Sequence, residues 1–404
     1  MRSLRQHTWH GFGNEAWVGW GSDLARKIRV GVIFGGRSGE HEVSLMSARS
    51  VMDALDNSKY QVVPMGITKQ GKWLTAGDPM KTLQHLLAQA SQAHPSEAEP
   101  TQSRALQVQR VRRELVPGAG EAGIPNVDVV FPVLHGPYGE DGTVQGLLEL
   151  AGIPYVGAGV LGSALAMDKA AMKGIFRAQG LPVADWVVVM RWDWEEHPKE
   201  VTQRLEERIG YPCFVKPANL GSSVGVTKAH VAAELAPALN LAASYDRKLL
   251  VERAINAREF ELSVLGNDHP VASVPGEVVP RREFYDYVAK YEDEDTQLLI
   301  PADLPPDKAA ELQNLAVRAF VALDCAGMAR ADFLLDRDTL KVYINELNTI
   351  PGFTSVSMYP KLWAASGLPY PELLDRLIQL ALERHQDKAR MSTNYKADET
   401  CGRT

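Results

Sequence analysis

Cysteine is scarce in this chain of 404 residues, which contains only Cys213, Cys325 and Cys401. They are odd in number and far apart, and none stands in the C-x-x-C spacing of a zinc site. Neither a disulfide framework nor a zinc module is therefore indicated, and a reducing cytoplasm fits best. Long apolar runs are also missing. No run approaches the roughly 18 residues that suggest a membrane span, so we expect no membrane segment.

A basic excess is missing as well. The chain has 43 Lys and Arg against 50 Asp and Glu, a net charge of −7. This argues against a nucleic-acid partner, which usually needs a basic face, but a nucleotide ligand needs only a few local Lys and Arg. Hydrophobic residues make up 45% and charged residues 23%, as in soluble globular proteins. The length predicts two or three domains.

Three segments differ in composition from the rest of the chain. Residues 1–26 are rich in Trp and Gly without the apolar stretch of a secretory signal, so we treat them as an extension outside the fold. Residues 88–126 are rich in Ala, Gln, Ser, Glu, Pro and Gly and are predicted to be a surface insertion without a chemical role. The polar tail, residues 387–404, is predicted to be loose.

The first globular region alternates strands with helices, which predicts an α/β unit with a parallel sheet. A central unit mixes short strands and helices, and strands dominate after residue 248, so the overall class is α/β, or α+β for the whole chain. The predicted strands are 28–34, 61–68, 127–134, 186–190, 213–216, 224–227, 248–253, 259–265, 271–279, 327–335 and 341–347. The predicted helices are 45–55, 144–150, 163–179, 198–209, 230–243, 308–322 and 370–384.

Two glycine-rich segments resemble nucleotide motifs only in part. Residues 157–162 match G-x-G-x-x-G, but the acidic residue expected about 20 positions later is missing: Asp168 comes too early, and position 177 is Arg. We interpret this segment as a turn between domains. Residues 66–73 nearly match the P-loop, but Trp73 stands where Ser or Thr must hold Mg²⁺. We interpret that segment as a hairpin-like turn.

Four polar residues mark the two last predicted strands. Side chains two apart on a strand share a face, so Arg330 lies beside Asp332, and Glu346 beside Asn348. Neighbouring strands would place these side chains in one cleft. Hard divalent cations prefer such oxygen ligands together with phosphates, and Arg330 would bind an oxyanion. A surface salt-bridge cluster fits the same four residues equally well.

The surrounding sequence favours a nucleotide cleft. Gly352 allows close backbone approach, and the hydroxyl of Ser357 offers a donor for a carboxylate. Lys216 ends an apolar strand before the Gly- and Ser-rich loop 221–225, which suits phosphate binding. The loop lacks Walker spacing, so another nucleotide fold is required. Lys169 could supply a second phosphate contact.

The predicted strand 248–253 runs into a possible hinge at residues 254 and 255. Adenine needs an apolar slot, a backbone donor–acceptor pair and often a carboxylate for its amino group, and the segment from Glu252 to Ile255 could provide these. Glu259 could bind the ribose hydroxyls, and Glu261 lies on the same strand face as Glu259.

Six motifs in order resemble the bacterial D-alanine–D-alanine ligases of the A type, within the ATP-grasp superfamily. The resemblance runs from about Lys27 to His385. It implies a three-domain ATP-grasp fold: an N-terminal α/β domain (27–157), a small central domain (158–255) and a larger, mainly antiparallel C-terminal domain (256–386). The motifs cover residues 33–44, 135–142, 167–169, 215–217, 221–225 and 345–352.

The resemblance also implies an activity: ligation of two D-alanine molecules through a D-alanyl phosphate, with ATP and two Mg²⁺ (or Mn²⁺), for peptidoglycan precursors. A homodimer is expected. Two Mg²⁺ would be held by Asp332, Glu346 and Asn348. ATP would be bound by Lys169, Lys216, Ser223, Glu252, Ala254, Ile255 and Glu259. The catalytic residues would be Glu40, Ser222, Tyr291, Arg330 and the backbone N–H of Gly352. The D-alanine substrates would be bound by His135, Lys290 and Ser357.

Residues 284–291 resemble a lid that excludes water from the acyl phosphate. In the resembled family, a Tyr at position 291 accompanies an amine as second substrate and a Phe accompanies D-lactate, so a dipeptide product is predicted. The Glu40 motif and the Lys290–Tyr291 pair disfavour an ATP-grasp ligase of the biotin-carboxylase or peptide-ligase type. A dinucleotide oxidoreductase would depend on the incomplete motif at 157–162. A catalytically inactive homologue would show a broken metal or phosphate site, and none is seen in the sequence.

Overall fold

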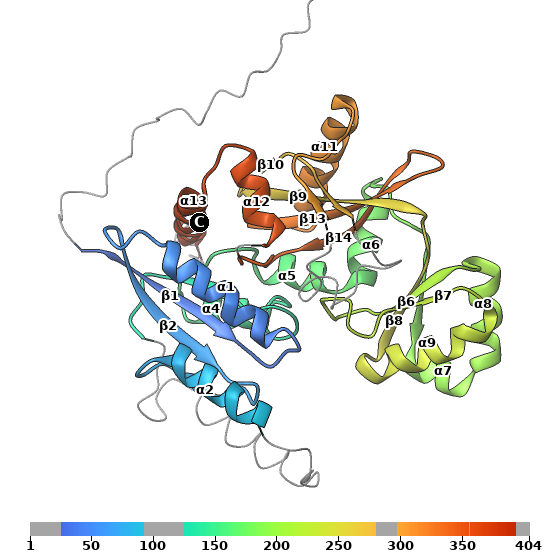
Figure 1. Ribbon diagram of the computed structural model, residues 1–404, viewed down its shortest axis with the longest axis horizontal. Coiled ribbons are helices and arrows are strands. Elements are labelled where there is room, and N and C mark those ends of the chain that lie inside the picture. Colours follow the sequence, from blue (N-terminus) through green and yellow to red (C-terminus); the bar gives the residue numbers. More distant parts are fainter. Residues whose placement is uncertain (1–25, 93–124, 280–296, 355, 393–404) are drawn as a thin grey trace, which may run out of the picture.

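Three β-sheets and the helices around them form the part of the chain that the computed structural model describes, residues 26–92, 125–279, 297–354 and 356–392 (Figure 1). Nearly all of the predicted N-terminal extension and most of the predicted insertion lie outside these ranges. So does the predicted lid with Lys290 and Tyr291. Among the described residues, no helix is both long and apolar enough to cross a membrane.

The N-terminal sheet has the order β3-β2-β1-β4, with β1 parallel to both β2 and β4. The predicted parallel α/β unit is therefore confirmed. β3 returns antiparallel to β2, so residues 66–73 form a hairpin, as predicted. Helix α2 includes the first residues of the predicted insertion, 88–92. The elements are β1 (Ile28–Gly35), α1 (His41–Ala54), β2 (Tyr60–Ile67), β3 (Trp73–Leu74), α2 (Pro79–Gln92), β4 (Val129–Val133) and α4 (Thr143–Leu150).

The central unit is an antiparallel sheet of order β5-β8-β6-β7 covered by helices (Figure 1). The strand predicted at 224–227 begins only at Thr227, because residues 222–225 form a turn. The elements are β5 (Trp186–Met190), α7 (Arg191–Glu196), α8 (Pro198–Arg208), β6 (Cys213–Pro217), β7 (Thr227–Ala229), α9 (Ala232–Tyr245) and β8 (Lys248–Arg253).

The C-terminal sheet has the order β12-β11-β9-β13-β14, with β10 also paired to β9. The strand predicted at 271–279 is interrupted at residues 273–275, where Pro275 cannot donate to a strand ladder. Helix α13 extends beyond the predicted end at 384 and includes the first residues of the predicted tail. The elements are β9 (Ala257–Gly266), β10 (Val271–Ala272), β11 (Gly276–Val279), β12 (Gln297–Leu299), α11 (Pro306–Ala322), β13 (Gly327–Asp336), β14 (Val342–Asn348), α12 (Met358–Ala365) and α13 (Tyr370–Ala389).

The helix predicted at 163–179 is two helices, α5 (Val160–Met167) and α6 (Lys169–Ala178). Asp168 separates them with extended backbone, and its carboxylate accepts N–H bonds from Ala170 and Ala171 at 3.1 and 3.0 Å. This is an N-cap, which satisfies amides that the first helical turn leaves unpaired. The break makes Lys169 the first residue of α6.

The largest apolar cluster joins the N-terminal sheet to the C-terminal helices. Phe34 and Phe131 from the sheet belong to the same buried cluster as Phe353, Trp363 and Leu377. The rings of Phe131 and Phe353 meet edge to face, with centroids 5.6 Å apart. This shared core places the carboxyl ends of β1 and β4 against the loop that follows β14.

Candidate active site

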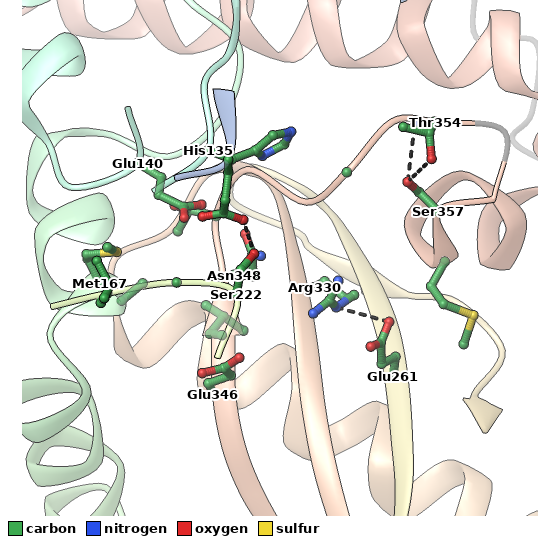
Figure 2. Close-up of a pocket in the computed structure, with 18 of the residues that line it drawn as sticks. His135, Glu140, Met167, Ser222, Glu261, Arg330, Glu346, Asn348, Thr354 and Ser357 are labelled. Atoms are coloured by element: carbon green, nitrogen blue, oxygen red, sulfur yellow. Dashed lines mark hydrogen bonds and ion pairs between the residues drawn. The ribbon is translucent and has the colours of Figure 1, made fainter. Parts of the chain in front are cut away.

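A cavity of about 110 Å³ lies where these segments meet. Its walls come from the start of α1, the end of β4, the start of α6, the loop after β6, and strands β13 and β14 (Figure 2). Nine of the predicted site residues line it: Glu40, His135, Lys169, Ser222, Arg330, Glu346, Asn348, Gly352 and Ser357.

The predicted face on the last two strands is confirmed by their register. β13 and β14 are antiparallel, with Arg330 opposite Asn348 and Asp332 opposite Glu346. The Arg330 guanidinium donates to both carboxylate oxygens of Asp332, at 2.7 and 2.6 Å, and its Nε lies 3.1 Å from Glu261 on β9. Burial lowers the pKa of Arg330, but Asp332 and Glu261 together raise it well above the ordinary value. Arg330 is thus a fixed cation facing the cavity.

The donor set suits a divalent metal. Asp332, Glu346 and Asn348 offer only oxygen ligands from adjacent strands, and an ionised carboxylate has about four lone-pair sites. Arg330 donates to both oxygens of Asp332, and a carboxylate oxygen can accept from a second partner as well. Among the described residues, no group of three His, Cys, Asp or Glu could hold a metal alone. In proteins, Mg²⁺ is usually held by one or two carboxylates together with substrate phosphates.

Glu40 and Ser222 join the N-terminal unit to the loop after β6. Glu40 is buried at the N-terminus of α1 and accepts a hydrogen bond from the Ser222 hydroxyl. Ser222 and Ser223 have left-handed backbone, with φ of 47° and 57°. Successive non-glycine residues in this region are uncommon and often mark functional loops. A Cβ at Gly221 would lie only 2.8 Å from Glu40 Oε2, so glycine permits this close approach.

His135 is held as one neutral tautomer. Its Nδ1 lies 3.0 Å from the carbonyl oxygen of Ile350, so Nδ1 carries the proton. The Ser47 hydroxyl is 3.3 Å from Nε2 and accepts the Phe353 N–H at 3.2 Å. Burial lowers the pKa of His135, although Glu40 opposes this. His135 therefore helps to hold the 350–353 segment in place, directly through Ile350 and through Ser47 at Phe353.

Glu140 is a cavity residue that the sequence analysis missed, although it stands within the motif at 135–142. It is buried and accepts the Gly136 N–H at 2.8 Å. Burial and the neighbouring Glu40 raise its pKa to about 8. The missed signal was a second carboxylate in a glycine-rich turn.

The predicted phosphate-binding lysines lie at the edge between the central and C-terminal units. The Lys169 ammonium donates to the Leu220 carbonyl at 2.7 Å and lies 3.6 Å from Glu346. Lys216 on β6 donates to Glu252 on β8. Burial lowers the pKa of Lys216, but Glu252 and Glu346 together hold it above the ordinary value. Both lysines are thus close to the predicted metal ligands.

The far end of the cavity carries the predicted second-substrate residue. Ser357 Oγ lies 2.7 Å from Thr354 Oγ1 and accepts the Thr354 N–H at 3.0 Å, as Figure 2 shows. A Cβ at Gly352 would approach Ser357 Oγ to 2.7 Å. The Gly352 backbone and the Ser357 hydroxyl therefore share one wall.

Other predicted residues lie outside the lining of this cavity. Ala254 donates its backbone N–H to Pro212 at 3.1 Å, and Ile255 follows it after β8. Glu259 lies on β9, opposite Leu334. Lys290 and Tyr291 fall outside the described residues. The cavity lining also excludes Lys216, Ser223, Glu252 and Asp332.

An antiparallel central sheet carrying Lys216, opposed to a second sheet carrying Asp332, Glu346 and Asn348, defines the class as an ATP-grasp ligase. Two family models match most of the chain: the N-terminal part of D-ala D-ala ligase over residues 29–158, and the C-terminal part over 175–379. The chain belongs to the D-alanine–D-alanine ligase family.

Relatives support this assignment along nearly the full length. A D-alanine–D-alanine ligase from Heliobacterium modesticaldum is 52% identical to this chain, and the match covers 91% of this chain and 98% of the relative. A D-alanine–D-alanine ligase from a Thermoanaerobacter species is 55% identical, and the match covers 90% of this chain and 99% of the relative. The Coxiella burnetii ligase structure has a TM-score of 0.74 at 38% identity, covering 90% of this chain and 97% of its own. The structure of the VanG D-Ala:D-Ser ligase from Enterococcus faecalis has a TM-score of 0.72 at 35% sequence identity, and the match covers 88% of this chain and 100% of that chain.

Proposed function

We propose that this chain joins two D-alanine molecules to D-alanyl-D-alanine with ATP and a divalent metal, for peptidoglycan precursor synthesis. Family membership over nearly the whole chain supports this activity. The observation that carries the residue assignments is one cavity whose lining includes Glu40 and Ser222 together with Arg330, Glu346 and Gly352. The Glu40 carboxylate fits an amino-acid ammonium, and the Arg330 guanidinium fits a reacting carboxylate.

The first step is activation of a poor electrophile. Glu40 would hold the ammonium of the first D-alanine. The carboxylate oxygen of that D-alanine would take the γ-phosphoryl group of ATP, and ADP would leave. Lys169 and Lys216 would neutralise phosphoryl charge, and Asp332, Glu346 and Asn348 would hold two Mg²⁺, with Mn²⁺ as a substitute. The metal supplies further positive charge at the phosphoryl oxygens.

The second step is attack on the acyl phosphate by the neutral amine of the second D-alanine, which forms the amide bond as inorganic phosphate leaves and the amine loses a proton. Arg330 and the Gly352 N–H would stabilise the tetrahedral oxyanion, and one such donor contributes roughly 3 kcal/mol. Arg330 suits this role because Asp332 and Glu261 hold its guanidinium in place. Ser357 and Lys290 would bind the carboxylate of the second D-alanine.

Adenine would lie at the end of β8, against the backbone of Ala254 and Ile255, with Glu259 near the ribose and Ser223 near the phosphates. Glu252 would contribute to the ATP site from β8. The domain bounds proposed for this arrangement are 27–157, 158–255 and 256–386. We also propose that the protein is a homodimer located in the cytoplasm.

Second-substrate specificity is proposed from Tyr291. With Tyr at this position, an amine is the expected acceptor, so D-alanine should be ligated and D-lactate rejected at neutral pH. Because the VanG D-Ala:D-Ser ligase is a structural relative of this chain, the assay also includes D-serine as a third acceptor. An ester or a D-alanyl-D-serine product in excess of the D-alanine dipeptide would contradict the specificity proposal.

The decisive experiment for the activity is phosphate release from ATP with D-alanine or L-alanine as the only amino acid. Release should depend on D-alanine and on a divalent metal, and a dipeptide should form in equal amount. Absence of D-alanine-dependent release would reject the proposed function.

A further inference from the structure

Lys173 is a buried cation outside every predicted role. It lies in α6 with 1% of its surface exposed and is among the largest fully buried side chains of the described residues. It follows Lys169 by four positions, so the two lysines lie on the same face of the helix. Its helix neighbours Met172 and Phe176 belong to a buried apolar cluster. A lysine so placed needs a specific partner.

That partner is Glu252. Lys173 Nζ lies 3.0 Å from Glu252 Oε2, and Lys216 donates to Glu252 Oε1. One carboxylate therefore connects a lysine of α6 to a lysine of β6, with only 3% of Glu252 exposed. Both carboxylate oxygens of Glu252 face lysine ammonium groups. Any contact between Glu252 and adenine would therefore be made by the backbone of Glu252. The side chain is better placed to orient Lys216.

Electrostatics support a fixed arrangement. Burial raises the pKa of Glu252, but Lys173 and Lys216 outweigh burial and hold it at about 2. Burial lowers the pKa of Lys173, which Glu252 opposes. One Glu252 carboxylate is shared between the side chains of Lys173 and Lys216, beside a cleft proposed to receive phosphates. A buried ion pair is weak evidence for stability, since apolar replacement is often neutral, and this favours a positioning role.

We propose that Lys173 is a positioning residue for the nucleotide: it holds Oε2 of Glu252, and Glu252 in turn directs the Lys216 ammonium toward the phosphates. This rests on the proposed ATP-dependent function. Lys173 does not touch the nucleotide. Its effect therefore depends on the phosphates and on the presence of Glu252.

The test is calorimetric binding of ADP and of adenosine, with Mg²⁺ and without D-alanine, to the full chain. Lys173→Met should weaken ADP binding about tenfold, ~1.4 kcal/mol, and leave adenosine binding within about twofold of the wild type. Lys173→Arg keeps a donor cation and should restore ADP binding. Lys388→Met is the matched control, because it removes an exposed lysine of α13 that is paired with Glu149 of α4. This variant should bind ADP and adenosine as the wild type does.

A double-mutant cycle tests the route through Glu252. In a Glu252→Gln background, Lys173→Met should cause no further loss of ADP affinity, because coupled residues are not additive. Additive losses, an unchanged ADP affinity, or equal losses for ADP and adenosine would each overturn the proposal.

Folding is controlled with Lys173→Gln, which keeps an N–H donor but not the charge and should also lose ADP affinity selectively. Failure of both neutral variants to fold would indicate a purely structural role and reject the proposal. If the wild type binds ADP and releases phosphate with D-alanine, and the Lys173→Met variant binds ADP equally well, only the role of Lys173 is rejected. Wild-type protein without D-alanine-dependent release rejects the proposed function itself.

Discussion

His135 Nδ1 donates to the carbonyl oxygen of Ile350 at 3.0 Å, across 215 positions of the chain. His135 follows β4 of the N-terminal sheet, and Ile350 follows β14 of the C-terminal sheet. The contact continues through Ser47 to the Phe353 N–H. The Gly352 backbone lies within the segment held in this way, so residues of the N-terminal unit determine where the proposed oxyanion donor points.

Ser47→Ala tests this connection. It leaves the Phe353 N–H and His135 Nε2 without their partner, a loss of about 1–3 kcal/mol for buried polar groups. We expect a lower melting temperature and a lower kcat, with the KM for ATP little changed. Thermal unfolding and phosphate-release kinetics measure these effects. Ser58→Ala, an exposed serine that bonds Asp56, is the control, and a Ser47 variant that behaves like it would disprove the connection.

Asp332→Asn tests the proposed metal ligands. The amide keeps the shape of the side chain but loses its charge, while Arg330 keeps Glu261 as a partner. We expect kcat to fall about 100-fold or more, because metal-assisted phosphoryl transfer needs the ion in place. We also expect a higher Mg²⁺ concentration to be needed for half-maximal activity. Titration of activity with Mg²⁺, supported by circular dichroism for folding, measures this. Asp338→Asn in the exposed β13–β14 turn should match the wild type, and equal activity of both variants would remove the metal assignment.

Gly221→Ala tests the Glu40 site by steric means. The added methyl group would lie 2.8 Å from Glu40 Oε2 and 3.4 Å from Glu140 Oε1. The Glu40 carboxylate must shift, so the KM for D-alanine should rise about tenfold, which corresponds to roughly 1.4 kcal/mol of lost binding. Steady-state kinetics with varied D-alanine provide the measurement. Gly146→Ala, which has open space around its Cβ, should have wild-type kinetics. An unchanged KM for Gly221→Ala would mean that Glu40 does not bind the substrate.

Glu140→Gln tests a pH effect on stability in the metal-free and nucleotide-free protein. The folded pKa of Glu140 is raised to about 8 from 4.5. The stability that this carboxyl contributes is therefore fully present below about pH 4.5 and is lost as pH rises toward 8, by up to ~1.4 kcal/mol per pH unit. The Gln variant does not titrate, so its advantage over the wild type should grow from pH 5 to pH 8. Denaturant unfolding across this range measures the difference, and parallel pH profiles would refute the shift.

Several local features could be read from the sequence because they depend on near neighbours. Side chains two positions apart on a strand share a face, which predicted that Arg330 lies beside Asp332. The Gly-rich segment at residues 66–73 indicated a hairpin. The break at Asp168 was also readable in principle, since Asp before a helical run is a capping signal. Pro275 likewise indicated the interruption between β10 and β11. These errors came from treating one apolar run as one element.

The sequence by itself determined the class of fold, the strand faces and, through the motifs, the family and most of the candidate site. Only the tertiary structure decided that Lys173 is buried against Glu252, that Glu140 is buried beside Glu40, and that Ser47 connects His135 to Phe353. The face on which a side chain lies is set by its own backbone. Its burial and its charged neighbours depend on distant segments, as in the hydrogen bond that joins Phe353 to Ser47 across 306 positions. A lysine four positions after Lys169 is an ordinary helix residue until β8 places a carboxylate against it.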